Sequence, residues 1–72
     1  MNAPIGIGVL SFAHGHVAMY VHVMKQFDDV RLVAAYDADP VRGRSVCESV
    51  GMRYAPNVED VLDDPDIQAV MI

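Results

Sequence analysis

The segment Ile5–Phe27 reads IGIGVLSFAHGHVAMYVHVMKQF and carries two hydrophobic periodicities on either side of a short break. Ile5–Leu10 is apolar with a period of two, which is typical of a strand buried in a parallel sheet. Further on, apolar residues recur at the spacing of one helix face, at Val17, Tyr20, Val21, Met24 and Phe27. The intervening residues, Ser11–His16, are therefore predicted to form a turn that leads from a strand into a helix.

The next segment repeats this order of strand and helix. Val30–Tyr36 is too short for a typical helix and is rich in residues that favour strands. Asp39 and Pro40 then predict a helix start, because Asp can accept hydrogen bonds from free N–H groups and Pro loses none at the first helical position. Gly51 predicts its end in a left-handed conformation. The inner face of this helix is expected to consist of Val41, Val46, Cys47 and Val50.

The last third of the chain predicts one more helix and one more strand. Residues 52–55 allow a short extended piece, Asn57 and Asp60 have the spacing of a cap for a helix through Leu62, and Ile67–Ile72 is a strand. The fold class is therefore α/β, a Rossmann-like βαβαβ unit with three parallel strands that begin a doubly wound sheet. Because an apolar parallel strand needs neighbours and covering helices, we expect this sheet to be truncated. Residues 1–72 are then the N-terminal part of a dinucleotide-binding domain.

Composition excludes several functional classes. A chain of 72 residues allows one domain at most, so we expect that these residues as given are not a complete two-domain enzyme. The net charge of −5, with only five basic residues, argues against a nucleic-acid partner. Cys47 is the only cysteine and cannot form an internal disulfide. The sequence therefore gives no sign of an oxidising compartment. No basic leader is present and no apolar run reaches the ~18 residues of a membrane helix, so we expect a cytoplasmic protein without a membrane partner.

The turn after the first strand is the first candidate site. In an open parallel sheet, this turn can offer backbone N–H groups and a helix N-terminus to a pyrophosphate, usually through a G-x-G-x-x-G motif. Gly6 and Gly8 approach that spacing, but they lie inside the strand, where the motif cannot work. The register that fits the topology assigns cofactor binding to Ser11, Phe12, Ala13, His14, Gly15 and His16, with Ser, Ala and His replacing the three glycines.

The second candidate is Asp37, at the end of the second predicted strand. It follows His16 by 21 residues, close to the ~20-residue spacing of the acid that binds the ribose of NAD. A carboxylate there can accept hydrogen bonds from both ribose hydroxyls and repels a 2′-phosphate. NAD is therefore the predicted cofactor, with NADP left open because Arg42 and Arg44 lie within reach of a phosphate. The structural alternative for Asp37 is a solvated acid in a turn.

Other residues have two interpretations each. His14 and His16 either line the cofactor turn or are solvated residues at a helix start. They do not predict a metal site with His22, because no Cys, Asp or Glu stands close enough to complete the ligand set. Phe12 either stacks on the cofactor or fills the gap between turn and sheet. Cys47 is expected to be a small core residue rather than a reactive thiol.

From Ile7 to Ile72 the sequence resembles the N-terminal Rossmann half-domain of the glucose–fructose oxidoreductase, inositol dehydrogenase and MocA (Gfo/Idh/MocA) family. The resemblance rests on the segments IGVLSFAHGH, LVAAYDADPVRGRSV and NVEDVLDDPDIQAVMI, in this order. The turn SFAHGH is similar to a subset of the family in which the motif glycines are replaced. The resemblance implies an NAD(P)-dependent dehydrogenase that transfers a hydride between the nicotinamide and a sugar, inositol or related polyol. It also implies a homo-oligomer at full length.

The same resemblance places the catalytic residues outside these 72 residues. Family members use a lysine in an E-K-P motif beyond the third strand, together with a downstream Asp or His, and a separate substrate domain. Lys25 is the only lysine here and belongs to the first predicted helix, so no catalytic residue is carried over. We expect no activity from this chain alone, and an enzyme only if the native chain is longer. The alternative, which the replaced glycines favour, is a non-catalytic Rossmann-like binding or interaction module.

Overall fold

The computed structural model describes residues 4–13 and 15–72. Along the chain it contains β1 (Ile5–Val9), α1 (Gly15–Met24), β2 (Val30–Ala35), α2 (Pro40–Val50), β3 (Arg53–Tyr54), α3 (Val58–Leu62) and β4 (Ala69–Met71). The strands form one parallel sheet in the order β3-β2-β1-β4. The predicted α/β fold is confirmed. The sheet has four strands rather than three, because the short extended piece expected at residues 52–55 pairs with β2 as β3.

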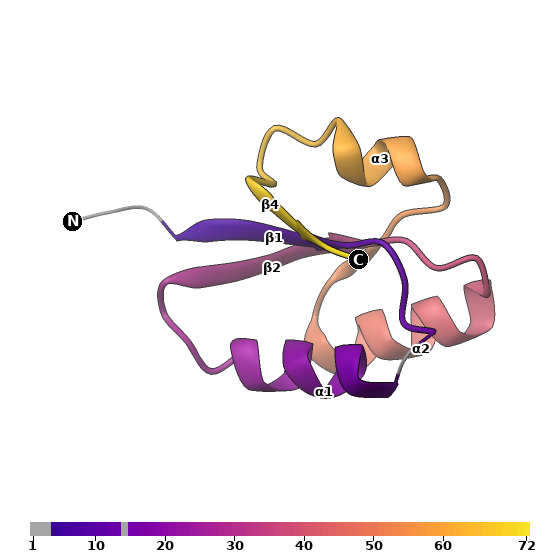
Figure 1. Ribbon diagram of the computed structural model, residues 1–72, viewed down its shortest axis with the longest axis horizontal. Coiled ribbons are helices and arrows are strands. Elements are labelled where there is room, and N and C mark those ends of the chain that lie inside the picture. Colours follow the sequence, from indigo (N-terminus) through magenta and orange to yellow (C-terminus); the bar gives the residue numbers. More distant parts are fainter. Residues whose placement is uncertain (1–3, 14) are drawn as a thin grey trace.

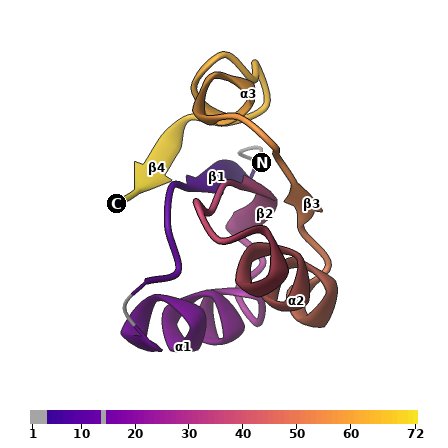
Figure 2. The same ribbon diagram turned by 90° about the vertical axis from the view of Figure 1, so that its right-hand side faces the viewer.

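The helices cover the sheet from two sides. Helices α1 and α2 lie on one face and α3 lies on the other (Figure 1). The carboxyl ends of β1 and β2 point to the same edge of the sheet, where the chain turns into α1 and α2. Figure 2 looks onto this edge, from which the chain passes into α1 and α2. No helix in residues 4–13 and 15–72 is long and apolar enough to cross a membrane.

The capping residues of α2 behave as predicted. Asp39 accepts hydrogen bonds from the N–H groups of Val41 and Arg42 at 3.1 and 3.2 Å. Gly51 ends the helix at φ 78°, the left-handed conformation that glycine adopts without strain. Asn57 does precede α3, but its side chain makes no capping hydrogen bond, so there only the position was predicted correctly.

The predicted inner faces of the helices need correction at three residues. Val17 and Val21 of α1 are buried, whereas Tyr20 is 49% exposed and Phe27 is 54% exposed. Tyr20 lies on the flank of that face, and Phe27 lies beyond the end of the helix at Met24. In α2, Val41 is 79% exposed. It precedes the buried Gly43 by two residues, or about 200° of helix rotation, so it faces away from the sheet.

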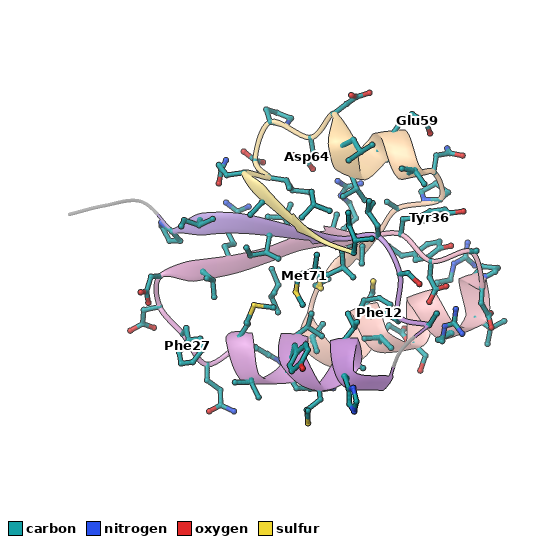
Figure 3. The ribbon with its side chains drawn as sticks, in the orientation of Figure 1. Phe12, Phe27, Tyr36, Glu59, Asp64 and Met71 are labelled. Atoms are coloured by element: carbon teal, nitrogen blue, oxygen red, sulfur yellow. The ribbon has the colours of Figure 1, made fainter. Side chains whose placement is uncertain are left out.

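The main core lies between the sheet and the pair α1 and α2. Its buried side chains are Val9, Phe12, Val17, Val21, Ala35, Cys47, Val50 and Met52. Met71 packs against this cluster from β4. Figure 3 shows both Met71 and Phe12 on the face of the sheet that α1 and α2 cover. The buried Val61 of α3 covers the opposite face, while Glu59 points outward from α3 in the same view.

Two glycines let α3 and the chain leading into β4 lie directly against β1. A Cβ atom on Gly6 would stand 1.7 Å from the carbonyl oxygen of Asp66, and one on Gly8 would stand 2.6 Å from Cγ1 of Val61. Gly6 also donates its N–H to Oε1 of Gln68 at 2.7 Å and accepts from the N–H of Gln68 at 2.9 Å. These glycines serve strand packing, which agrees with their exclusion as a phosphate motif.

Candidate functional site

Asp37 is the centre of the hydrogen-bond network at the carboxyl edge of the sheet. It lies two residues beyond β2, and its side chain is fully buried. Arg42 donates to both carboxylate oxygens at 2.7 Å, from Nε to Oδ2 and from Nη2 to Oδ1. The N–H of Phe12 donates to Oδ2 at 3.3 Å, and the N–H of Asp39 donates to Oδ1 at 3.0 Å. Asp37 is therefore not a solvated turn acid.

This network brings the two predicted sites together. The bond from Phe12 joins the turn after β1 to the end of β2, although the two residues are 25 positions apart in sequence. The bonds from Asp39 and Arg42 join the same carboxylate to the start of α2. A paired carboxylate with good geometry is a strong acceptor, so Asp37 fixes the turn and α2 relative to each other.

The Asp37 carboxylate is stabilised in its charged form. The hydrogen bond from Arg42 lowers the pKa of Asp37, burial acts in the opposite direction, and the N–H groups of Asp39 and Phe12 lower it further. The net lowering means that these hydrogen bonds outweigh the cost of desolvation. In return, Asp37 raises the pKa of the Arg42 guanidinium. The pair is therefore ionised at neutral pH.

The lowered pKa of Asp37 predicts a loss of stability in acid. A carboxyl with a lower pKa in the folded than in the unfolded state contributes stability above its unfolded value of about 4. That contribution is lost as the pH falls through the lower folded value. We expect the free energy of unfolding of an Asp37→Asn variant to vary less between about pH 6 and about pH 3 than that of the parent. Urea titrations at each pH measure the difference, and parallel pH profiles would contradict it.

A second set of contacts supports Asp37 from α2 and β3. The hydroxyl of Tyr54 donates to the backbone carbonyl of Asp37 at 3.0 Å. Gly43 of α2 stands against both residues: a Cβ there would lie 2.5 Å from Cε1 of Tyr54 and 2.8 Å from Cβ of Asp37. Gly43 weakens helix propensity, but its missing side chain permits this close approach.

Gly43→Ala is therefore expected to destabilise the protein. On helix propensity alone this change would stabilise α2 by about 1 kcal/mol. The clash with Tyr54 and Asp37 reverses the sign, and overpacking predicts a loss of about 1 to 3 kcal/mol. Chemical denaturation measures the free energy of unfolding. Ser45→Ala, at an exposed position of the same helix, is the control and should be neutral or slightly stabilising. A gain in stability for Gly43→Ala would contradict this prediction, because it would mean that α2 and β3 can move apart at little cost to make room for the added Cβ.

The predicted cofactor turn is partly exposed. Oγ of Ser11 accepts the N–H of Ala13 at 3.0 Å, and Ala13 itself is exposed. The side chain of Phe12 is 3% exposed and packs in the core, as its packing alternative predicted. Gly15 and His16 are exposed and open α1, which begins two residues before Val17. His14 lies outside the described residues.

The pair of Asp37 and Arg42 is layered with respect to solvent. The Arg42 side chain is 40% exposed, whereas that of Asp37 is 0% exposed. A ligand that approaches this edge from solvent therefore meets the cation first, with the acid beneath it. The sequence predicted a carboxylate that accepts hydrogen bonds from both ribose hydroxyls, whereas here both carboxylate oxygens already accept from Arg42.

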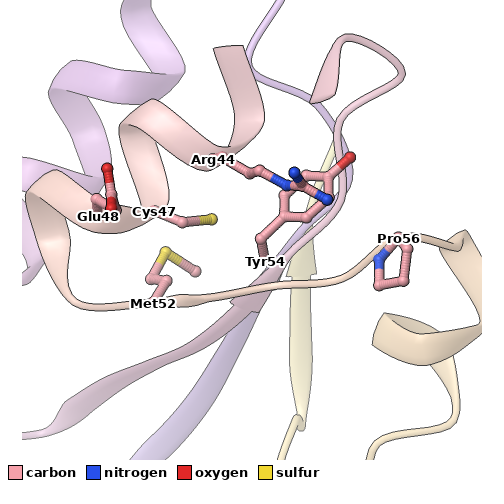
Figure 4. Close-up of a pocket in the computed structure, with 6 residues that line it drawn as sticks. All are labelled: Arg44, Cys47, Glu48, Met52, Tyr54 and Pro56. Carbon is pink, nitrogen blue, oxygen red and sulfur yellow. The ribbon is translucent and has the colours of Figure 1, made fainter. Parts of the chain in front are cut away.

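A separate cavity of about 460 Å³ lies between α2 and β3. Figure 4 shows its lining residues, Arg44, Cys47, Glu48, Met52, Tyr54 and Pro56. The guanidinium of Arg44 lies over the ring of Tyr54, 5.3 Å from its centroid. Burial raises the pKa of the Cys47 thiol, which disfavours the reactive thiolate. In the part of the chain that the structure describes, no three His, Cys, Asp or Glu residues are grouped to hold a metal ion.

Sequence reasoning missed three contributors to this site. Arg42 was considered only as a residue within reach of a phosphate, and neither Tyr54 nor Gly43 was linked to Asp37. An arginine in the first turn of a helix that follows a buried acid was a usable signal for the ion pair. The contact with Tyr54 had no comparable signal, because it depends on β3 lying beside β2.

Comparisons with known proteins agree with the fold. The model of the GFO_IDH_MocA family, described as an oxidoreductase family with an NAD-binding Rossmann fold, matches residues 3–72. Among solved structures, the chain is similar to GenD2 from gentamicin A biosynthesis in complex with NAD, with a TM-score of 0.85 and 19% sequence identity. That alignment covers 100% of this chain and 21% of GenD2, so the likeness shows the fold. No curated protein sequence gives a significant match.

Proposed function

This chain belongs to the Gfo/Idh/MocA oxidoreductase family and carries its NAD-binding Rossmann fold, and from this membership we propose how its residues hold the dinucleotide. The turn Ser11–His16 and the N-terminus of α1 hold the pyrophosphate. Asp37, with Arg42 in front of it, lies at the adenosine ribose. The observation that carries this proposal is the hydrogen bond from Phe12 to Asp37, because it fixes the turn beside the end of β2.

The shape of the turn fits a pyrophosphate. Ala13 is small and exposed, and no described atom beyond the chain neighbours lies within 4 Å of a Cβ placed on Gly15. A phosphate can therefore approach the backbone closely here. The N-terminus of α1 also offers N–H groups and a partial positive charge that favour an anion. At the first two of the replaced motif glycines, Ser11 and Ala13 are small, and the third replacement, His16, is exposed at the start of α1.

We propose that the whole protein is a dehydrogenase, an activity that needs residues beyond 1–72. NAD supplies hydride acceptance or donation when it is bound. This chain's residues would bind and orient the cofactor. The substrate is proposed to be a sugar, inositol or related polyol, and the whole protein a cytoplasmic, homo-oligomeric dehydrogenase. The substrate, the activity and the homo-oligomer rest on the family resemblance, with the catalytic and substrate-binding residues carried outside residues 1–72, and the cytoplasmic location rests on the sequence pattern alone.

The binding proposal is tested by titrating the native protein, at its natural length, with NADH and following nicotinamide fluorescence. Ala13→Glu places a carboxylate where the pyrophosphate is proposed to lie. We expect it to weaken NADH binding by about tenfold or more through charge repulsion. Gln26→Glu adds the same charge at an exposed position just beyond the other end of α1, and should leave binding unchanged. Equal affinities for parent and Ala13→Glu would contradict the assignment of the turn. Absence of any saturable NADH binding would favour a non-catalytic module.

A further inference from the structure

The cavity of about 460 Å³ between α2 and β3 is separate from the proposed cofactor site. Among the described residues, its lining includes neither Asp37 nor Arg42 nor any residue of the turn after β1. Its volume lies toward the lower end of the range of about 300 to about 1,000 Å³ that is typical of small-molecule pockets. The cavity therefore has room for a ligand of about the size of a single amino acid.

The apolar walls of this cavity are held in place by the rest of the fold. Cys47 and Met52 are 2% and 7% exposed, and the N–H of Met52 donates to the carbonyl of Cys47 at 3.0 Å. The ring of Tyr54 is fixed through its hydroxyl, which donates to the carbonyl of Asp37, and through its close approach to Gly43. Because these walls are already ordered, a ligand can bind without a large entropic cost in the protein.

The chemistry of the walls favours an aromatic group inside the cavity. The thiol of Cys47 and the thioether of Met52 bring two sulfur atoms, which make favourable contacts with aromatic rings. Tyr54 offers a ring for aromatic pairing, and Pro56 adds apolar surface. Figure 4 shows that these side chains come from α2 on one side and from the chain through β3 on the other.

Two side chains of opposite charge stand at the rim of the cavity. Arg44 and Glu48 are exposed and lie one helical turn apart on α2, a spacing that places their Cβ atoms about 5 to 6 Å apart. The guanidinium of Arg44 lies over the ring of Tyr54, 5.3 Å from its centroid. In the described part of the chain, neither Arg44 nor Glu48 takes part in an ion pair. The rim therefore offers one cation and one anion to a ligand.

A free α-amino acid carries the complementary pair of charges. Its carboxylate and ammonium groups are attached to one carbon atom, so they are close enough together to pair with Arg44 and Glu48 at once. Arginine binds a carboxylate through two parallel N–H donors. A carboxylic acid without an amino group would instead bring a second negative charge beside Glu48, and an amine without a carboxylate would bring a second positive charge beside Arg44.

We propose that this cavity binds a free α-amino acid with an aromatic side chain. The aromatic ring lies among Cys47, Met52 and Tyr54, the carboxylate binds Arg44, and the ammonium group binds Glu48. This inference goes beyond NAD binding and does not depend on it, because the two sites have no lining residue in common. It also gives Cys47 a place in a binding site, whereas the sequence predicted only a small core residue.

The test is a titration of the native protein, at its natural length, with L-phenylalanine, followed by ligand-observed NMR. We expect saturable binding with a dissociation constant below about 1 mM. Phenylpropionate lacks the ammonium group and phenethylamine lacks the carboxylate, so each should bind at least about tenfold more weakly. Absence of saturable L-phenylalanine binding up to about 10 mM would overturn the inference, and so would equal affinity for either analogue. These comparisons use the parent protein, so they do not depend on the folding of a variant.

An arginine variant tests the charged rim. Arg44→Met should weaken the binding of L-phenylalanine by about tenfold without weakening that of phenethylamine, because only L-phenylalanine has a carboxylate for Arg44 to bind. Arg31→Met removes the same charge from an exposed position on β2 and should leave both affinities unchanged. Equal losses for the two ligands in Arg44→Met would overturn the role of Arg44.

A titration in the presence of saturating NADH shows whether the amino acid occupies this cavity or the cofactor site. The dissociation constant of L-phenylalanine should change by less than about threefold, since the two ligands do not share a wall. Competition between them, measured as a dissociation constant that rises in proportion to the NADH concentration, would place the amino acid in the cofactor site and overturn the inference.

Discussion

Replacing Gly6 with alanine is expected to destabilise the protein by about 3 kcal/mol or more. The added Cβ would lie 1.7 Å from the carbonyl oxygen of Asp66, which is a backbone atom and cannot move away as the tip of a side chain could. To make room, the segment before β4 must shift. That shift breaks the two hydrogen bonds between Gly6 and Gln68 and loosens the pairing of β1 with β4. Urea or thermal denaturation of the native-length protein measures the effect.

Gly15→Ala is the matched control for this prediction. The same substitution at Gly15 meets no described atom beyond its chain neighbours within 4 Å, and the residue belongs to α1. Its expected effect is between zero and a gain of about 1 kcal/mol from helix propensity. If both variants unfolded with the same free energy, close packing at Gly6 would not be the reason for the glycine.

Asp37→Ala is expected to cost about 3 kcal/mol in the free energy of unfolding. The change removes a buried acceptor that binds Arg42 and the N–H groups of Phe12 and Asp39. Arg42 can be rehydrated because its side chain is 40% exposed. The N–H of Phe12 is buried, and it therefore loses a partner that water replaces poorly. Denaturant titration at neutral pH measures the loss.

The comparison for Asp37→Ala is Asp63→Ala. Asp63 is exposed after α3, and this variant removes the same formal charge. We expect a change within about 0.5 kcal/mol for it. A small effect of Asp37→Ala, similar to that of Asp63→Ala, would mean that the network around Asp37 does not hold the turn in place. It follows that loss of NADH binding in Asp37→Ala would not by itself prove contact with ribose.

The sequence was sufficient for the fold because its local signals agree. Asp39, Pro40 and Gly51 mark the ends of α2 through backbone chemistry that acts within a few residues, and the structure has the helix between them. The prediction was weaker where burial depends on distant neighbours. Tyr20 and Phe27 fit a helical period but are exposed, because the period alone does not say how wide the covered face is.

The site was predictable in position but not in its contacts. The spacing from the turn to Asp37 correctly placed both at one edge of the sheet, since that distance follows from the order of strand, helix and strand. The burial of Asp37 beneath Arg42 follows from how closely α2 approaches β3, which depends on Gly43 and Tyr54. Such a close approach is a three-dimensional fit between residues of different elements, and no local sequence pattern encodes it.

The pairing of β1 with β4 has a consequence for folding during synthesis. β1 is an inner strand of the sheet, yet Gly6 bonds to a residue 62 positions later. At ~5–20 residues per second, a ribosome needs roughly 3 to 12 seconds to make that partner. Until then one edge of β1 is open to strands of other nascent chains. Gly6 and Gly8 are poor strand formers, so the same two residues that make room for the late partner also make the waiting strand a weak template for aggregation.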